Sequence, residues 1–391
     1  MKILYSFPHP ADRLGSQGAG HVIRATALLN ALEMLGNEVV RVEAASESRT
    51  RASVGVYRNL VRNLLPRHIA MKVRDLGRIR HGKRYAVRLL EAAQRNKPDL
   101  ILETHIAFSL AGKIVSERTG VPLVLDDCSP AWEEEQQYGV GLRDAALRIH
   151  REVTGHASLV IAVNDTMRKY LLDGGLSADR VITVENGFDE SIFNSGNNGH
   201  RCRKRYQIPG DAVVIVFVGS FQPYHRVDLL LEAFSAMPNE QTGAYLLLVG
   251  GGRTVTDCRA LAEKLGVTDR VIFTDRIAYE DVPSHVAAGD IAVMPATNSY
   301  GNPMKIYEYM AMGKAVVAPF QPTIEEIATH GKDSFLFEPE NIGSLAQALD
   351  ALVVDQELRR RLGEQGRRLA SEHTWNKRAV LLQSAFERAL Q

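Results

Sequence analysis

Residues 299–319 read "SYGNPMKIYEYMAMGKAVVAP" and combine a turn, a short helix and a strand. Asn302 is predicted to cap the helix, with Pro303 at the first helical position, where a missing N–H costs nothing. Gly313 suits the left-handed residue that ends a helix, and the "AVVA" that follows is typical of a buried strand. A second apolar run, "DIAVMPA", precedes the turn. The unit therefore places a polar loop at the carboxyl end of a strand, where open α/β sheets bind ligands.

The same alternation of short apolar strands and longer helical patterns runs along the whole chain. The first set of predicted strands is "KILYSF", "EVVRVEA", "DLILETH", "PLVLDDC", "SLVIAVN" and "RVITVENG". The second set is "AVVIVFVGS", "YLLLVGGG", "RVIFTD", "IAVMPA", "AVVAP" and "SFLFEP". Strand–helix alternation predicts parallel sheets with helices on both faces. We therefore predict an α/β protein with two doubly wound, Rossmann-like domains that face each other across a cleft.

The domain boundaries follow from length and local composition. A chain of 391 residues is too long for one ordinary core. The polar, glycine-rich segment 191–211 separates the two sets of strands and is predicted to be a linker. The predicted domains are residues 1–190 and 212–372. The last helix, about residues 373–391, is expected to pack back onto the first domain.

The composition and the start of the chain indicate an ordinary cytoplasmic protein. Apolar residues make up 45%, charged residues 24%, and the net charge is +1, as in soluble globular proteins. The first residues lead directly into "ILYSF", which is too short for a signal-peptide core, and no apolar run approaches a membrane span. Cys128, Cys202 and Cys258 are scattered without metal-site spacing, which predicts free thiols in a reducing compartment.

One strong charge imbalance lies in residues 49–88, which carry twelve Lys or Arg and one acid, Asp75. The apolar residues that recur there at helical spacing are Val56, Leu60, Val61, Leu64 and Leu65. A basic amphipathic segment of this kind binds anionic membranes or polyphosphate. The alternative is a solvated face whose charge is balanced by acids elsewhere. No nucleic-acid recognition motif accompanies the segment, so no nucleic-acid partner is expected.

Two charged residues in the helix of the opening stretch are candidates for binding a ligand. Lys305 lies in the first turn, beside exposed backbone N–H groups, so a diphosphate would meet the helix dipole, amides and an ammonium together. Glu308 lies one turn later on the same face, where a carboxylate can accept both hydroxyls of a ribose. The alternative is a solvated Lys–Glu pair, which the apolar neighbours Ile306 and Met310 disfavour.

Two further loops follow strands in the second half. In "FVGSFQPYHRVDLLLEAF", His225 and Arg226 lie just before a helix and form an anion site unless Arg226 is paired with Asp228. In "LLLVGGGR", three glycines let backbones approach closely, and we interpret this loop as a tight turn with Arg253 in solvent.

The run "GNPMKIYEYMAMGKAVVAP" resembles the Pro-x-Lys-x-x-Glu-Tyr-Met-Ala-x-Gly signature of the GT4 family of nucleotide-sugar glycosyltransferases, which have the GT-B fold. The segment "SLVIAVNDTMRKYLLDGGLSADRVITVENGFDESIF" is similar to the end of the family's first domain. The loops "FVGSFQPYHRVDLLLEAF" and "RVIFTDRIAYEDVPSHVAAGDIAVMPA" follow in the family's order, so the resemblance covers most of the chain. It implies a retaining, metal-independent transfer of a sugar from a nucleoside diphosphate sugar, such as a UDP-sugar, to a hydroxyl acceptor.

The resemblance also implies roles on the donor side. Glu308 would bind the ribose, the turn 301–305 would bind the diphosphate, and Arg276 and Ile277 would contact the base. The residues expected to bind the donor are Gly18, Ala19, Ser220, His225, Arg226, Arg276, Ile277, Tyr300, Gly301, Asn302, Pro303, Met304, Lys305 and Glu308.

The chain departs from the family pattern at four of these positions. His225 stands where many relatives have a phosphate-binding lysine, and Arg226 where they have glycine, so the positive charge is displaced by one residue. Ser220 takes the place of a frequent arginine. Tyr300 takes the place of a second motif glutamate, which leaves open what performs the role of that acid.

In the first half, "GSQGAGH" resembles the loop that wraps the donor phosphates and the acceptor, with Gly18 and Ala19 at the paired-glycine position. His105 ends a predicted strand, where the family often has a His or Arg that reaches the transferred sugar. The residues expected on the acceptor side are His21, Asp126 and Glu134, and the expected catalytic residues are His105, Arg226 and Lys305. No Asp-x-Asp motif ends a strand, so neither a metal nor a cofactor is expected.

Three other functions compete with this hypothesis. An NAD-dependent oxidoreductase needs GxGxxG directly after a strand, but "GSQGAG" is offset and follows a long loop. A sugar-nucleotide epimerase or a phosphorylase can use the same two-domain fold, and a non-catalytic binding protein would be expected to lose Lys305 or Glu308. The sequence does not name the sugar, the base or the acceptor, for which both a lipid-linked molecule and a natural-product core are open. A lipid-linked acceptor would suit peripheral contact of residues 49–88 with the inner membrane face.

Overall fold

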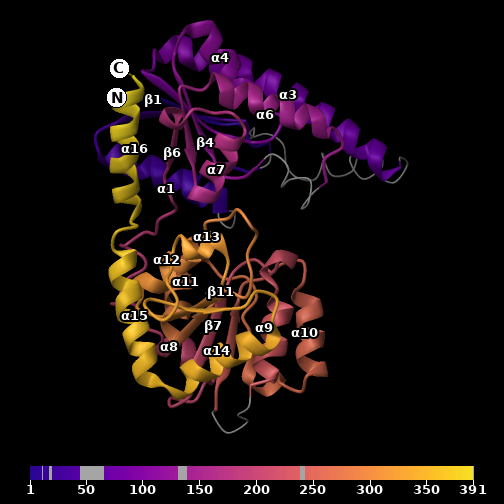
Figure 1. Ribbon diagram of the computed structural model, residues 1–391, viewed down its shortest axis with the longest axis vertical. Helices are drawn as coiled ribbons and strands as arrows, with labels where there is room; N and C mark the ends of the chain where they lie inside the picture. The colour runs from indigo at the N-terminus through magenta and orange to yellow at the C-terminus, as the bar shows by residue number, and fades with distance from the viewer. Residues whose placement is uncertain (11, 17–19, 45–65, 131–138, 238–242, 391) are drawn as a thin grey trace. The chain divides into compact units, whose positions relative to one another are not determined.

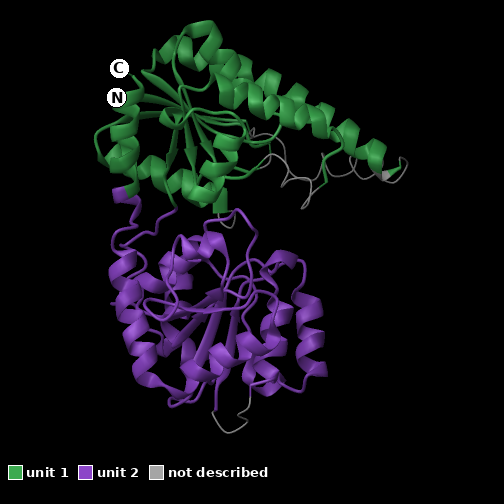
Figure 2. Ribbon diagram, in the orientation of Figure 1, with its two compact units in different colours: residues 1–185, 378–391 green, residues 186–377 purple. Residues whose placement is uncertain are grey.

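The computed structural model describes residues 1–10, 12–16, 20–44, 66–130, 139–237 and 243–390. This part of the chain forms two compact units (Figure 2). Unit 1 comprises Met1–Glu185 and Arg378–Gln391, and unit 2 comprises Asn186–Lys377. Each unit contains one sheet of six parallel strands with helices packed against it (Figure 1). The predicted α/β architecture with two doubly wound domains is thus confirmed.

Unit 1 is built on a sheet with the strand order β2-β1-β3-β4-β5-β6. Its strands are β1 (Lys2–Phe7), β2 (Glu38–Glu43), β3 (Leu100–Thr104), β4 (Leu123–Asp127), β5 (Leu159–Ala162) and β6 (Val181–Thr183). Its helices are α1 (Gly20–Met34), α3 (Arg67–Asn96), α4 (Ala111–Thr119), α6 (Arg143–His156), α7 (Asp165–Asp173) and most of α16 (Trp375–Ala389). Every residue of β3, β4 and β5 is buried, as expected for inner strands covered on both faces.

Unit 2 has the strand order β12-β11-β10-β7-β8-β9. Its strands are β7 (Val214–Val218), β8 (Tyr245–Val249), β9 (Val271–Phe273), β10 (Ile291–Val293), β11 (Ala315–Pro319) and β12 (Phe335–Phe337). Its helices are α8 (His200–Arg205), α9 (Val227–Ser235), α10 (Val255–Lys264), α11 (Val282–Ala288), α12 (Met304–Ala311), α13 (Pro322–Glu325), α14 (Ile342–Val354) and α15 (Gln356–Ala370).

The two faces of the sheet in unit 2 contribute to two separate apolar cores. In β7, Ile215 and Phe217 belong to one core, whereas Val214 and Val216 belong to the other. This division follows from the two-residue period of a strand, in which successive side chains point to opposite faces. Both faces of β7 therefore need apolar side chains, which explains why its sequence is apolar at every position.

The observed division of the chain differs in detail from the predicted boundaries. Unit 2 begins at Asn186, and residues 191–211, which were predicted as a linker, lie within it. Phe193 and Cys202, from this polar segment, are buried in the core of unit 2. Beyond Lys377 the last helix belongs to unit 1, where Nδ2 of Asn37 donates a hydrogen bond to Gln383 (3.0 Å).

Two further predictions concern the basic segment and the cysteines. Residues 49–65 lie outside the described residues, whereas the rest of the segment belongs to α3. Among the described residues, no helix is both long enough and apolar enough to cross a bilayer. Cys128, Cys202 and Cys258 are free thiols.

Candidate active site

The strand order of unit 2 creates a switch point between β7 and β10. The chain runs from β7 to β8 and β9 on one side, and then continues with β10, β11 and β12 on the other side. The loops after β7 and β10 therefore leave the same edge of the sheet in opposite directions. Open α/β sheets bind ligands in the crevice at such a point.

Helix α12, which follows β10, is fixed at both ends. The backbone N–H groups of Gly313 and Lys314 bond to the carbonyls of Met310 (2.8 Å) and Tyr309 (3.1 Å), and Gly313 has φ +68°. This is the left-handed helix end predicted from the glycine. The Tyr309 hydroxyl accepts a hydrogen bond from the Val218 N–H (2.8 Å), which ties α12 to the end of β7.

The predicted helix cap at Asn302 is wrong. Pro303 occupies the capping position, and the Asn302 side chain makes no capping hydrogen bond. Instead, Oδ1 of Asn302 accepts from the Asn186 N–H (3.0 Å) and Nδ2 donates to the Tyr307 hydroxyl (3.2 Å). Burial explains the difference, because a buried amide must be bonded, and here its partners are the Asn186 backbone and the Tyr307 hydroxyl instead of the free N–H groups of the first helical turn.

Lys305 reaches the loop that follows β7. Its Nζ lies 3.5 Å from Nε2 of His225 and 4.8 Å from the ring centroid of Phe217. A Cβ at Gly219 would lie 2.7 Å from the same Nζ, so the ammonium would have to shift if this residue were not glycine. The structure thus brings together Lys305 and His225, two residues predicted for the donor site.

The His225 imidazole is neutral and serves to hold Lys305. Burial and the nearby Lys305 lower the pKa of His225 to about 3. Its Nδ1 bonds to the Ser220 carbonyl, so Nδ1 carries the proton and Nε2 is left to accept from Lys305. Burial also lowers the pKa of Lys305 to about 8, which leaves the ammonium as the charged group of this pair at neutral pH.

Glu308 lies one turn further along α12, where it is also buried. Burial raises the pKa of its carboxyl group to about 7, against the opposing effect of Lys305. The Tyr279 hydroxyl donates a hydrogen bond to Oε1 of Glu308 (3.4 Å). The cation and the carboxyl group thus lie on one helix face, as the sequence indicated, and their roles in donor binding stay predictions. Tyr279 is a partner of Glu308 that the sequence did not reveal.

Arg226 is oriented away from this pair. It forms ion pairs with Asp228 (3.1 Å) and with Glu340, in agreement with the paired alternative weighed from the sequence. Its backbone has φ +46°, in the left-handed region that favours glycine. This conformation accounts for the glycine that the family has at this position. A catalytic role for Arg226 stays a prediction.

The glycine loop after β8 packs against the loop after β7. A Cβ at Gly250 would lie 2.1 Å from the Gly219 carbonyl oxygen, and one at Gly252 would lie 2.7 Å from the Phe221 nitrogen. These glycines therefore allow close backbone packing, as the tight-turn interpretation requires. Arg276 is exposed beside Gly251.

The remaining donor-side predictions are placed as follows. Ile277 packs partly buried against the core of unit 2, and Tyr300, Gly301, Pro303 and Met304 are partly buried around the start of α12. Gly18 and Ala19 lie outside the described residues, as does the acceptor-side candidate Glu134.

In unit 1, His105 follows β3 and lies beside a buried His–Asp pair. Nε2 of His150 lies 2.8 Å from Oδ2 of Asp127, and the His105 and His150 ring centroids are 5.2 Å apart. Burial opposes both charges, yet their mutual attraction lowers the pKa of Asp127 and raises that of His150. Asp126 was the predicted acid in this stretch and Asp127 was missed, because a sequence does not show which of two adjacent acids a strand turns toward His150.

We expect Asp127→Asn to destabilise the fold by about 3–5 kcal/mol, because it leaves His150 buried without its partner. The raised pKa of His150 contributes stability below its unfolded value of about 6.5, and this is lost as the pH rises through the folded value. The lowered pKa of Asp127 contributes above about 3.9. Urea unfolding should therefore show a larger loss at pH 5.5 than at pH 8.5. An equal loss at both pH values, or a similar loss for the exposed Asp173→Asn, would contradict this pairing.

Asp126 forms a second buried ion pair in unit 1. Arg24 donates to its carboxylate through Nη2 (2.9 Å) and Nε (3.1 Å), and the two side chains are 2% and 7% exposed. Nη2 of Arg24 also donates to the Val184 carbonyl (3.0 Å). Asp126 thus has a structural partner that the sequence did not reveal, and its acceptor-side role stays a prediction.

Arg24→Met is expected to cost about 3–5 kcal/mol of folding free energy, since it leaves the Asp126 carboxylate buried and uncompensated. Adding Asp126→Leu should restore a large part of the lost folding free energy, because the second change removes the buried charge. A double-mutant cycle by chemical denaturation measures this coupling. Additive losses would show that the two residues do not depend on each other.

Comparison with known proteins places these features in a family. The chain is 26% identical over 324 residues to a protein named D-inositol 3-phosphate glycosyltransferase from Geodermatophilus obscurus, covering 78% of this chain and 71% of that protein. It is 28% identical over 246 residues to a protein of the same name from Corynebacterium glutamicum, covering 59% of this chain and 57% of that protein. It is also 28% identical over 187 residues to a protein named GDP-mannose-dependent alpha-(1-6)-phosphatidylinositol monomannoside mannosyltransferase from Mycobacterium tuberculosis, covering 46% and 48% of the two chains.

Solved structures of glycosyltransferases have the same fold. Anabaena HepE, solved with UDP and glucose, matches with a TM-score of 0.74 at 20% identity, covering 99% of this chain and all of that chain. Sucrose-phosphate synthase from Thermosynechococcus elongatus matches with a TM-score of 0.75 at 17% identity, covering 99% and 98%. These likenesses establish the GT-B fold.

Two family models divide the chain between them. The model described as Glycosyltransferase Family 4 matches residues 18–192, and the model described as Glycosyl transferases group 1 matches residues 200–369. The first matched region contains β2 to β6 of unit 1, and the second contains all six strands of unit 2 together with Lys305 and Glu308. The chain therefore belongs to the GT4-like glycosyltransferases of the GT-B fold.

Proposed function

We propose that this glycosyltransferase moves a sugar from a nucleoside diphosphate sugar to a hydroxyl acceptor, with retention of configuration and without a metal in the reaction. The observation that carries the proposal is the placement of Lys305 and Glu308 on one face of α12, at the switch point of unit 2. A diphosphate bound at Lys305 would put its ribose beside Glu308, within reach of the carboxylate. Tyr279, which is hydrogen-bonded to Glu308, and the start of α12 are the other parts of this proposed donor site.

Lys305, His225 and His105 have separate roles in the proposed reaction. The bond between the anomeric carbon and the diphosphate oxygen breaks, and negative charge develops on the departing diphosphate. The Lys305 ammonium, held by His225, stabilises that charge in a buried site, where such an interaction is strong. The acceptor oxygen bonds to the anomeric carbon on the same face, and its proton passes to the departing phosphate oxygen. His105 is proposed to contact the transferred sugar from unit 1.

The names of the relatives guide the choice of substrates. Two are named for D-inositol 3-phosphate and one for phosphatidylinositol monomannoside, so polyol and lipid-linked acceptors are proposed before natural-product cores. Because Anabaena HepE was solved with UDP, uridine nucleotides are the first donors to test, followed by GDP-mannose.

Net transfer from a panel of nucleotide sugars tests the proposal. We expect release of the nucleoside diphosphate only when a hydroxyl acceptor is present, with the same anomeric configuration in product and donor. Excess chelator should leave the rate unchanged. Isomerised nucleotide sugar without transfer would indicate an epimerase, and turnover that requires inorganic phosphate would indicate a phosphorylase.

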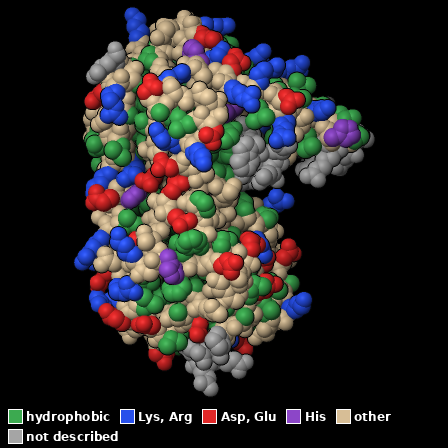
Figure 3. Space-filling model, viewed as in Figure 1, with side chains coloured by type: hydrophobic (Ala, Val, Ile, Leu, Met, Phe, Trp, Pro, Cys, Tyr) green, Lys and Arg blue, Asp and Glu red, His purple; other side chains and the backbone are tan. Residues whose placement is uncertain are grey.

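Helix α3 supports the proposed contact with an anionic membrane. One stripe at helical spacing is formed by the exposed residues Lys72, Val73, Leu76, Arg80, Lys83, Arg84, Val87 and Arg88, and an exposed acid, Glu91, follows one turn after Val87. The apolar members are well exposed, with Val73 at 48%, Leu76 at 51% and Val87 at 53%. Figure 3 shows blue basic and green hydrophobic side chains together along this helix. A mixed basic and apolar stripe of this kind suits the headgroup region of a bilayer.

We expect the chain to sediment with anionic liposomes at low salt and to leave them as the salt concentration rises. Lys72→Glu/Arg80→Glu/Arg84→Glu should abolish this binding, because each basic residue near an anionic surface contributes on the order of 1 kcal/mol. The matched control is Arg361→Glu/Arg367→Glu/Arg368→Glu, three exposed positions on α15. Equal binding to neutral liposomes, or an equal loss in the control, would contradict the membrane contact.

A further inference from the structure

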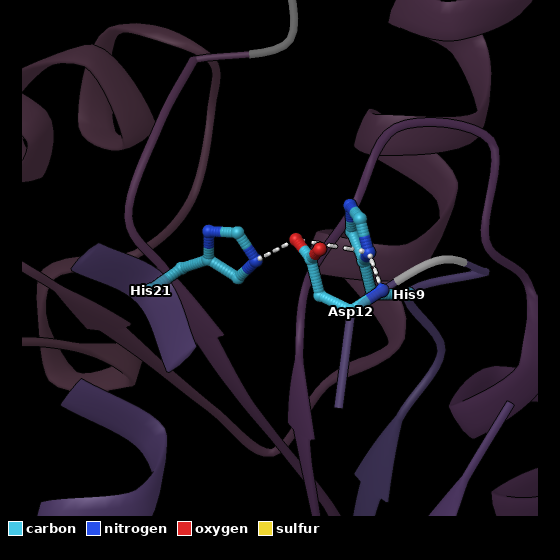
Figure 4. Close-up of side chains that lie close together, drawn as sticks. All are labelled: His9, Asp12 and His21. Atoms are coloured by element: carbon cyan, nitrogen blue, oxygen red, sulfur yellow. Dashed lines mark hydrogen bonds and ion pairs between the residues drawn. The ribbon is translucent and has the colours of Figure 1, made fainter. Parts of the chain in front are cut away.

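Two histidines and an aspartate meet at the switch point of unit 1. His9 and Asp12 lie in the loop after β1, and His21 is the second residue of α1. In the sheet order of unit 1, β1 lies between β2 and β3, just as β7 lies between β8 and β10 in unit 2, so this loop corresponds to the loop after β7. Figure 4 shows the Asp12 carboxylate between the two imidazole rings.

The distances place three potential ligand atoms around one point. Oδ2 of Asp12 lies 3.0 Å from Nε2 of His21 and 3.3 Å from Nδ1 of His9. All three atoms lie within 4.8 Å of one another. Atoms that share one zinc ion at about 2.1 Å are roughly 3.0–3.5 Å apart, so only the two imidazoles need a small adjustment.

The hydrogen bonds leave two acceptors, Nδ1 of His9 and the Asp12 carboxylate, facing each other. The Asp12 N–H donates to Nδ1 of His9 (2.9 Å), so this nitrogen carries no proton and faces the carboxylate as a second acceptor. Nε2 of His21 is buried and has the Asp12 carboxylate as its partner at 3.0 Å. A cation between these atoms would relieve the repulsion between Nδ1 of His9 and the Asp12 carboxylate. The His9 ring would exchange its amide bond for the ion, and the His21 ring would carry its proton on Nδ1 so that Nε2 can bind it.

We propose that His9, Asp12 and His21 form a site for a divalent transition-metal ion of the zinc class. Two imidazole nitrogens and one carboxylate oxygen are the ligand set that suits Zn²⁺ and Co²⁺, whereas Mg²⁺ and Ca²⁺ prefer oxygen. The remaining coordination positions would be filled by water. The bound ion would link the loop after β1 to the start of α1. This inference goes beyond the proposed function and does not depend on it.

The second His–Asp–His group in unit 1 is not a comparable site. In the group of His105, Asp127 and His150, the side chains of Asp127 and His150 are only 1% and 7% exposed, and they are already bonded to each other. The side chains of His9, Asp12 and His21 are 28%, 30% and 35% exposed, so an ion can reach them from solvent. This site was not predicted from the sequence, because its three residues have no recognised metal-motif spacing.

Titration of the metal-free full chain with Co²⁺ and Zn²⁺ tests the proposal. We expect one equivalent of each ion to bind by calorimetry, with visible Co²⁺ absorption bands and a higher melting temperature. His9→Ala and His21→Ala should each weaken Zn²⁺ binding at least tenfold, a loss that even an outer partner of a metal ligand can cause. The matched control is His200→Ala, an exposed histidine in unit 2 that should leave binding unchanged.

Three results would overturn the site: no binding by the wild type, unchanged one-to-one binding in both variants, or an equal loss in the control. Circular dichroism and the melting temperature of each metal-free variant show whether the fold is intact. Since the wild-type titration needs no variant, the proposal can be refuted even where a variant does not fold. The readouts do not use transfer activity, so a failure here is separate from a failure of the proposed function.

Discussion

Lys305→Met is expected to lower the rate of sugar transfer roughly 100- to 1,000-fold, the scale seen when one stabilising donor is removed from a transition state. The reduction should fall mainly on kcat, because the ammonium acts most strongly on the charge that develops on the leaving diphosphate. Methionine has nearly the length of the lysine stem and fills the same space beside Phe217. The variant therefore removes the charge while keeping the packing.

The melting temperature of Lys305→Met shows whether its loss of transfer activity is caused by unfolding. Burial lowers the pKa of Lys305 to about 8, so the folded state binds its proton less tightly than the unfolded state does. The charged lysine therefore costs stability at neutral pH, and Lys305→Met should melt at the same temperature or higher. The control is Lys332→Met, an exposed lysine of unit 2 that should retain full activity. A folded Lys305→Met variant with normal turnover would remove this residue from the reaction.

Glu308→Gln should weaken binding of the nucleotide sugar about 10- to 100-fold, the range expected for hydrogen bonds to a charged group. The amide keeps the shape of the side chain but donates through one of its two polar atoms, so it cannot accept from both ribose hydroxyls. Calorimetry with the donor that binds best measures the change. Glu325→Gln, at an exposed position on α13, is the matched control and should bind normally.

The pH dependence of donor binding provides a second readout for Glu308. Burial raises the pKa of Glu308 to about 7, so affinity should fall as the pH drops through this value and the carboxylate becomes protonated. Affinity should also fall as the pH rises above about 8, where Lys305 loses its proton. Glu308→Gln should lose the acidic limb and keep the alkaline one. An unchanged acidic limb in the variant would exclude Glu308 as its source.

Much of the fold was predictable because strands and helices leave local patterns. The runs around β7 and β10 are apolar on both faces, which identifies inner parallel strands. The linker prediction failed because residues 191–211 have no local pattern that shows their packing. Phe193 and Cys202 are single apolar residues in a polar segment, and only packing in three dimensions shows that they belong to the core of unit 2.

In the candidate site, too, some residues could be predicted from local patterns and others could not. Lys305 and Glu308 were found from their spacing on one short helix, which is a local property. Their partners His225 and Tyr279 come from other loops, and the contacts between them depend on strand order, which no local pattern specifies. Arg226 shows the same limit, since its pairing with Glu340 joins residues that are far apart in the chain.

A crystal structure of the chain with the nucleoside diphosphate that binds best tests the central claim most directly. We expect a diphosphate oxygen within about 3.2 Å of Nζ of Lys305, and the ribose hydroxyls within the same distance of the Glu308 carboxylate. A nucleotide ordered elsewhere, with Lys305 still on His225 and Glu308 still on Tyr279, would contradict it.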